Sequence, residues 1–361
     1  MSILRRKNQA KLKPLNKITQ KALVRRLFFK QKVQIKMTQI QDEELANQQN
    51  LQSALEEWTL NPSPKNLDTL RQLSFNNFPN WHFPMMQDQA RLNFYQQCFE
   101  GKLNGKVVLD VGAGGGLLSA LAIQFGARKI YAIERHPTLC TILKVIFAEQ
   151  IKTGVLILIE KDTKELTQND FQDSPEILIH EIFSIDGVGE GVLRTMNDLR
   201  VFSFWEDLEL IPHHFQLWIE LISWPEGVMA MPYKQIGPIS FNLFSELARM
   251  IPEQLTHSRA KNELWKSISK PYNIFDHPLK ESFKTNELVS TIELSSETTP
   301  THIRLWFECF DQKKTNQFSS NLKVSSNHWG NYCYPIPEEH FSGKLNVHFE
   351  ISSNGFRIIN F

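Results

Sequence analysis

The sequence predicts an α/β domain followed by a mainly β domain, and two patterns carry this prediction. Between residues 106 and 211, short β-branched runs alternate with helical segments, which is typical of a parallel sheet covered by helices on both faces. After residue 212, short strands follow one another with turn residues between them. The expected strands of the first region are residues 107–111, 130–133, 155–159 and 177–179. Their almost continuous apolar character indicates burial on both faces.

The N-terminal 36 residues differ in charge from the rest of the chain. They carry 12 Lys or Arg and no Asp or Glu, which leaves 28 basic against 39 acidic residues in the remainder. We expect this basic head to be disordered, with a transit-like segment, a nucleic-acid-binding arm and an acidic-surface anchor as open alternatives. The acidic remainder would attract cationic substrates.

The overall composition indicates a globular, soluble protein. Of its 361 residues, 41% are hydrophobic and 22% are charged, and no apolar run is long enough to span a membrane. The four cysteines lie far apart, without the paired spacing of a metal site or the density of a disulfide framework. We therefore expect a reducing compartment, most simply the cytoplasm.

Helical segments precede the α/β region. Residues 37–80 form a helical preface, because residues 38–60 are rich in Gln, Glu, Leu and Ala and two prolines at 62 and 64 end the helix. Residues 85–99 are helical again, with Arg91 and Tyr95 one turn apart.

The region from residue 212 to 361 predicts a second, mainly β domain. We expect strands at residues 215–222, 290–294, 303–310 and 345–351. A helical insertion at residues 241–254 and 259–268 should interrupt them.

A glycine-rich turn follows the first strand and predicts a nucleotide-like ligand. Glycines at Gly112 and Gly114 let the backbone approach a ligand closely, and the helix that follows offers free N–H groups. Leu117 stands where the dinucleotide fingerprint has its third glycine, which disfavours a nicotinamide cofactor. Glu134 ends the next strand, where an acid can accept hydrogen bonds from ribose hydroxyls.

Two further acids follow the fourth strand. Glu181 comes directly after this strand, at the sheet edge where α/β proteins bind ligands, and Glu190 comes nine residues later. Two carboxylates in one pocket would repel each other unless a cation lies between them. The planar fork of a guanidinium matches this geometry, whereas no His or Asp cluster completes a metal site.

These motifs resemble the protein arginine methyltransferase family, in order, over most of residues 81–361. Residues 82–91 are similar to the first helix of the family, and Glu181 and Glu190 match its double-E loop. Asn327-His328-Trp329 is similar to its Thr-His-Trp loop. The resemblance implies S-adenosylmethionine as cofactor, held by His82, Arg91, Gly112, Gly114 and Glu134. It also implies Glu181, Glu190, His328 and Asp88 as catalytic residues, with His328 paired to Asp88, and Met85 and Trp329 as substrate-binding residues.

The resemblance implies a fold and an activity. A Rossmann-like, seven-stranded methyltransferase domain at residues 81–211 should precede a β-barrel-like substrate domain at 212–361. The reaction would be methyl transfer to the guanidinium of a protein arginine. The sequence of the double-E loop is more similar to that of the monomethylating (type III) branch and its bacterial relatives than to that of dimethylating members. The dimerisation arm, residues 224–237, looks short, which leaves a homodimer open.

Two other functions stay open at this point. One is a methyltransferase for a small molecule or nucleic acid, although no Asn/Asp-Pro-Pro-aromatic run follows the fourth strand. The other is a catalytically silent scaffold that binds cofactor or arginine, because the tyrosine pair expected before the first helix is replaced by residues 75–78, Phe-Asn-Asn-Phe. The intact glutamates and Arg91 favour an enzyme.

Overall fold

The computed structural model describes residues 46, 49–58, 60–75, 82–224, 235–236, 238–240, 242–243, 251–256, 265–283, 288–324, 327–337, 340–352 and 355–360. The chain divides into two compact units, residues 1–76 and 77–361. In the first unit, residues 49–58 are helical and α2 spans Pro64–Phe75, with Leu51, Ala54 and Leu70 forming a small core. The described part of the expected preface is therefore helical. The basic head lies outside the described residues.

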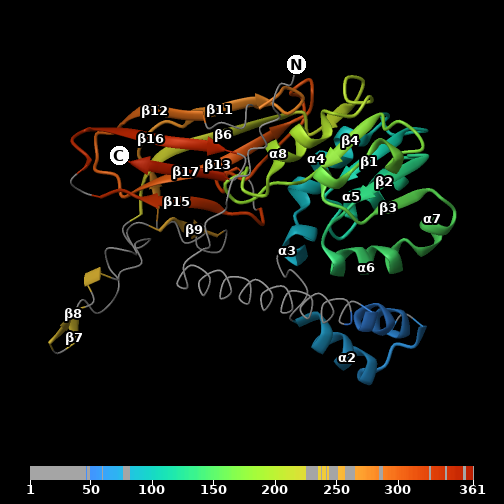
Figure 1. Ribbon diagram of the computed structural model, residues 1–361. Coiled ribbons are helices and arrows are strands. Elements are labelled where there is room, and N and C mark those ends of the chain that lie inside the picture. The colour runs from blue at the N-terminus through green and yellow to red at the C-terminus, as the bar shows by residue number, and fades with distance from the viewer. Residues whose placement is uncertain are drawn as a thin grey trace, which may run out of the picture. The chain divides into compact units, whose positions relative to one another are not determined.

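The second unit contains a parallel sheet with helices around it (Figure 1). Its strand order is β3-β2-β1-β4-β5. Successive strands are added toward one edge of the sheet as far as β3 and toward the other edge from β4 on, so the order switches between β1 and β4. Ligands of open α/β sheets bind at this switch point, beyond the carboxyl ends of the strands. The strands are β1 (Val107–Val111), β2 (Lys129–Ile133), β3 (Leu156–Ile159), β4 (Ile177–His180) and β5 (Glu209–Ile211). The four strands expected from the sequence are confirmed.

Helices precede and connect these strands. The chain first forms α3 (His82–Met86) and α4 (Gln89–Phe99), in place of the single helix expected over residues 85–99. The break falls at Asp88, whose side chain caps α4 by accepting a hydrogen bond from the backbone N–H of Arg91. The later helices are α5 (Leu117–Gln124), α6 (Pro137–Ile146), α7 (Ala148–Lys152) and α8 (Val192–Leu199), with short 3-10 turns at Thr163–Glu165 and Gln168–Asp170.

Among the described residues the parallel sheet contains five strands, fewer than the seven that the resemblance implied. After β5 the chain enters β6 (His214–Ser223). This strand pairs antiparallel with three strands of another sheet: β10 (Lys266–Ser267), β11 (Tyr272–Pro278) and β13 (His302–Phe310). The residues that would extend the parallel sheet are thus used to begin the second domain.

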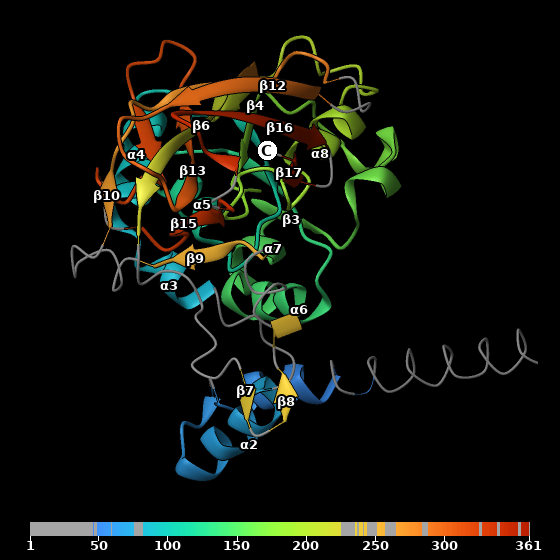
Figure 2. The same ribbon diagram turned by 90° about the vertical axis from the view of Figure 1, so that its left-hand side faces the viewer.

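The rest of the unit is antiparallel and barrel-like, as expected (Figure 2). One sheet has the order β10-β6-β13-β15-β9, with β11 on β6 and β14 on β13, and a second has the order β12-β16-β17. The expected strands in this region are confirmed. The bounds are β11 (Tyr272–Pro278), β12 (Leu288–Ser295), β13 (His302–Phe310), β14 (Gln317–Ser319), β15 (Asn331–Pro335), β16 (Lys344–Ser352) and β17 (Gly355–Asn360).

The expected helical insertion lies mostly outside the described residues. Residues 242–243 are helical, but the C-terminal ends of its two segments are strands. β9 (Glu253–Leu255) pairs with β15, and β10 (Lys266–Ser267) pairs with β6. In β9 the outer two residues are buried and Gln254 is exposed, so a period of two overrides the local helical preference. Most of the expected arm also lies outside the described residues, apart from a hairpin of β7 (Gln235–Ile236) and β8 (Ile239–Ser240).

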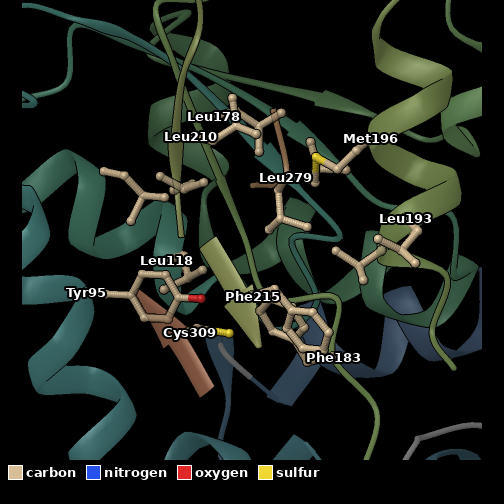
Figure 3. Packing of buried hydrophobic residues seen from close by; sticks show 14 of the residues in the cluster. Tyr95, Leu118, Leu178, Phe183, Leu193, Met196, Leu210, Phe215, Leu279 and Cys309 are labelled. Atoms are coloured by element: carbon tan, nitrogen blue, oxygen red, sulfur yellow. The ribbon is translucent and has the colours of Figure 1, made fainter. Parts of the chain in front are cut away.

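One hydrophobic core joins the α/β sheet to the barrel (Figure 3). Phe183, just after β4, stacks on Phe215 of β6 at 5.5 Å and on Phe307 of β13 at 5.4 Å. Lys280, after β11, donates hydrogen bonds to backbone carbonyls of the loop before β5, at residues 205, 206 and 208. These contacts fix the barrel against the segment that leaves β4 and against the loop that leads into β5. No helix in the described part of the chain is both long enough and apolar enough to cross a membrane.

Candidate functional site

The glycine-rich turn brings three segments of the site together. Gly112 and Gly114 have φ angles of +72° and +56°, a conformation that L side chains rarely adopt. A Cβ at Gly112 would lie 3.3 Å from Ile182, and a Cβ at Gly114 would lie 3.2 Å from Nε2 of His82. The turn therefore lies against α3 on one side and against the residue after Glu181 on the other.

Glu134 lies under this turn, at the end of β2. Its Oε2 accepts a hydrogen bond from the backbone N–H of Gly114 at 2.8 Å, and its Oε1 accepts one from His136 at 2.6 Å. Backbone donors thus hold the buried carboxylate in one orientation. Because a carboxylate oxygen has two lone pairs, each oxygen can still accept a bond from a ligand hydroxyl.

Arg91 and Glu181 form a buried ion pair beside the turn. Nη1 of Arg91 donates to Oε2 of Glu181. Burial raises the pKa of the Glu181 carboxyl, although the charge of Arg91 opposes this effect. Nε and Nη2 of Arg91 and Oε1 of Glu181 are buried without a hydrogen-bond partner among the described residues. Buried polar atoms in this state are costly, so a polar ligand would complete the pair.

Asp88, at the start of α4, connects this helix to His328 in a loop of the barrel, 240 residues later. Its Oδ1 caps α4, while its Oδ2 accepts a hydrogen bond from the backbone N–H of His328 at 3.2 Å and lies 3.0 Å from Nδ1 of its ring. Burial acts to raise the pKa of Asp88, but the hydrogen bonds from His328 and Arg91 prevail and lower it. The carboxylate therefore stays ionised next to the imidazole.

Trp329 is buried beside His328 and holds the double-E loop. Its indole N–H donates to the carbonyl of Phe183 at 2.7 Å, and its ring stacks on Phe318 at 5.5 Å. The role of Trp329 as a wall that contacts the substrate arginine stays a prediction. The substrate-binding role of Met85, which is half-buried in α3, also stays a prediction. The barrel thus contacts the double-E loop through a specific hydrogen bond.

Glu190 ends the loop and is exposed as a whole residue, although the surrounding protein crowds its carboxyl group. Burial by the surrounding protein, followed by the charges of Glu181 and Asp186, raises the pKa of Glu190 to about 7, and Arg135 opposes the shift. The charge of Glu181 therefore acts on the Glu190 carboxyl. This arrangement favours a cation between them.

Sequence reasoning passed over three residues at this site. Oδ2 of Asp110, in β1, accepts from Ser119 at 2.6 Å, while its Oδ1 is buried without a partner among the described residues; burial raises its pKa to about 7. The Tyr95 hydroxyl donates to the carbonyl of His180 at 2.6 Å, directly before Glu181. The third residue, Asp186, lies within the double-E loop and accepts a hydrogen bond from the backbone N–H of Gly189 at 2.8 Å. Two signals in the sequence could have indicated two of these residues. Asp110 directly precedes the glycine turn, and Tyr95 lies one helical turn after Arg91.

Comparisons with known proteins give relatives of similar sequence and solved structures of similar fold. No family model matches the chain. An arginine N(omega)-methyltransferase of Streptomyces achromogenes subsp. streptozoticus is 27% identical over 183 residues, 50% of this chain and 51% of that protein. Protein arginine N-methyltransferase 7 of Anopheles gambiae is 24% identical over 205 residues, 51% of this chain and 29% of that protein. A solved PRMT1 enzyme-prozyme complex with AdoHcy from Trypanosoma brucei matches with a TM-score of 0.64 at 17% identity, covering 77% of this chain and 89% of that one.

The fold and the site define a Rossmann-like domain whose ligand-binding edge adjoins a barrel-like domain. This is the fold of solved protein arginine methyltransferases, and the resemblance drawn from the sequence motifs is confirmed. The chain spans about half the length, or less, of the first curated relatives that it matches.

Proposed function

We propose that this protein transfers a methyl group from S-adenosylmethionine to a guanidinium nitrogen of a protein arginine. The observation that carries the proposal is the buried pair of Arg91 and Glu181 beside the glycine turn, each with polar atoms that have no partner in the part of the chain that the structure describes. One partner is suited to an anionic ligand group and the other to a cationic one.

The residues fit S-adenosylmethionine. The unpartnered N–H groups of Arg91 suit a carboxylate, because a guanidinium can donate two parallel bonds to it. Glu134 would accept hydrogen bonds from the ribose hydroxyls, and Gly112 and Gly114 would let the backbone approach, with His82 against the turn. When bound, the cofactor supplies an activated methyl group.

Glu181 and Glu190 would hold the substrate guanidinium and draw its charge toward two of its nitrogens. This would leave the third nitrogen free as the nucleophile for the activated methyl group, and positioning by the two glutamates would supply most of the rate. The guanidinium of free arginine stays protonated far above neutral pH, so losing its proton before the methyl transfer would be unfavourable. Asp88 and His328, already hydrogen-bonded to each other, would receive that proton during or after the transfer.

We further propose that the product is monomethylarginine and that the protein acts in the cytoplasm. The first proposal rests on the variant double-E loop, Glu-Ile-Phe-Ser-Ile-Asp-Gly-Val-Gly-Glu, between Glu181 and Glu190. The second rests on four cysteines that are all buried free thiols. An arginine-containing protein is the expected partner.

The rate of methyl transfer should fall as the pH falls through about 7. Glu190 must be ionised to hold a guanidinium, and its pKa is raised to about 7, so the protonated form dominates below that pH. We expect kcat/KM for an arginine peptide to lose about tenfold for each pH unit well below this pKa. A profile that is flat from pH 5.5 to 8 would contradict the role of Glu190.

Transfer of a radiolabelled methyl group to a panel of acceptors tests the proposal. The panel holds arginine-rich proteins, histone tails, the same peptides with lysine in place of arginine, and RNA. We expect label only on the arginine-containing proteins and peptides, with a mass increase of one methyl group on arginine. Label on RNA or on the lysine peptides would show that the acceptor is not arginine. Tight cofactor binding without label on any acceptor would indicate a catalytically silent scaffold.

A further inference from the structure

A third carboxylate, that of Asp186, lies between the two glutamates of the double-E loop and is almost fully buried. Its Oδ1 accepts hydrogen bonds from the backbone N–H of Gly189 at 2.8 Å and of Val188 at 3.2 Å, and from the hydroxyl of Ser184. Its Oδ2 accepts one from the backbone N–H of Phe356 at 3.0 Å. One side chain thus connects the loop to β17, 170 residues later.

Two glycines leave the space that this carboxylate fills. A Cβ at Gly189 would lie 2.9 Å from Oδ1 of Asp186, and a Cβ at Gly355 would lie 2.9 Å from Oδ2. Distances below 3.0 Å are too short for a Cβ, so neither position accepts a side chain unless Asp186 moves. Because Gly189 directly precedes Glu190, a displacement of Asp186 would be passed on to Glu190.

The other end of the loop has its own attachments. The carbonyl of His180 accepts the bond from Tyr95, and the carbonyl of Phe183 accepts the bond from Trp329. These two contacts hold the segment around Glu181. The contacts of Asp186 hold the segment that leads into Glu190.

We propose that Asp186 is a positioning residue for the arginine-holding site, fixing Glu190 relative to Glu181 by connecting the double-E loop to the last strand of the barrel. The inference rests on the proposed function. It makes β17 a structural part of the site, although the strand carries none of the residues assigned to the reaction.

Asp186 also has an electrostatic effect that a purely structural residue lacks. Its charge adds to burial and to the charge of Glu181 in raising the pKa of Glu190, and Arg135 acts in the opposite direction. Removing the charge should therefore lower the pKa of Glu190 while it loosens the loop. The acidic limb of the pH profile should then move to lower pH.

The first test replaces Asp186 by asparagine. An asparagine keeps one acceptor oxygen but turns an NH2 group toward backbone donors, so part of the attachment is lost. We expect KM for an arginine peptide to rise about tenfold, the acidic limb of kcat/KM to move to lower pH, and the Kd for S-adenosylhomocysteine to stay within about twofold. Asp276→Asn, on the exposed side of β11, is the control. An unchanged KM and pH profile, or an equal loss of peptide and cofactor binding, would overturn the proposal.

The second test acts from the far side of the contact and has a matched control. Gly355→Ala and Gly343→Ala both place a side chain at a positive φ, +137° and +90°, but a Cβ at Gly343 meets nothing within 4 Å. We expect only Gly355→Ala to raise KM and to speed hydrogen exchange in residues 184–191. Equal behaviour of the two variants would refute the coupling to β17. Hydrogen exchange needs no turnover, so a wild-type chain that methylates no arginine would refute the proposed function and leave this test valid.

Discussion

Replacing Glu190 by glutamine should lower kcat/KM for an arginine peptide by about 100-fold or more. Glutamine keeps the size of the side chain but removes the charge and one acceptor oxygen, and a hydrogen bond to a charged group contributes about 1.5–3 kcal/mol. The loss should exceed that of one bond because Glu181, with its raised pKa and its contact to Arg91, would have to hold the cation alone. Steady-state kinetics with an arginine peptide measure the effect.

Cofactor affinity separates this role from a general loss of structure. The Kd for S-adenosylhomocysteine should stay within about twofold in Glu190→Gln, because Glu190 makes no contact with the glycine turn or with Glu134 in the hydrogen bonds of the described residues. Glu149→Gln, on an exposed face of α7, is the control for the loss of one carboxylate. Near-normal turnover in Glu190→Gln would refute the two-glutamate arrangement.

Replacing Arg91 by lysine should weaken the binding of S-adenosylhomocysteine by about 100-fold. Lysine keeps the charge beside Glu181 but loses the fork of N–H groups that suits a carboxylate, together with the buried Nε and Nη2 donors. The free energy of unfolding should fall as well, by about 1–3 kcal/mol, because atoms of a buried pair lose their partners. Isothermal titration calorimetry and thermal unfolding measure the two effects.

The same substitution at an exposed arginine supplies the control for Arg91→Lys. Arg128 has a half-exposed side chain and a weak contact to Asp173, so Arg128→Lys should leave both quantities unchanged. If Arg91→Lys bound the cofactor as tightly as the wild type, Arg91 would serve only to neutralise Glu181.

The strands were predictable where one physical signal dominated. The buried strands β1 to β4 follow one another as apolar runs, and their burial on both faces leaves little other interpretation. The number of strands in the parallel sheet was not predictable, because β5 and β6 are separated by only two residues and pair in different sheets. The strand β9 was mistaken for helix because its pairing partner, β15, lies far along the chain.

The site residues were predictable as motifs but their contacts were not. Spacing placed Glu134 and Glu181 at the ends of strands, where the structure has them. The ion pair of Arg91 with Glu181 joins residues 90 positions apart, and the contact of Asp186 with Phe356 joins residues 170 apart. Such contacts depend on how the barrel packs against the α/β sheet, which no local pattern encodes.

A crystal structure of the protein with S-adenosylhomocysteine and an arginine peptide tests the central claim most directly. We predict that the amino-acid carboxylate of the ligand binds Arg91, that its ribose binds Glu134, and that the peptide guanidinium lies between Glu181 and Glu190 with one nitrogen directed at the ligand sulfur. A guanidinium bound elsewhere, or glutamates separated from the ligand by packed side chains, would contradict the account.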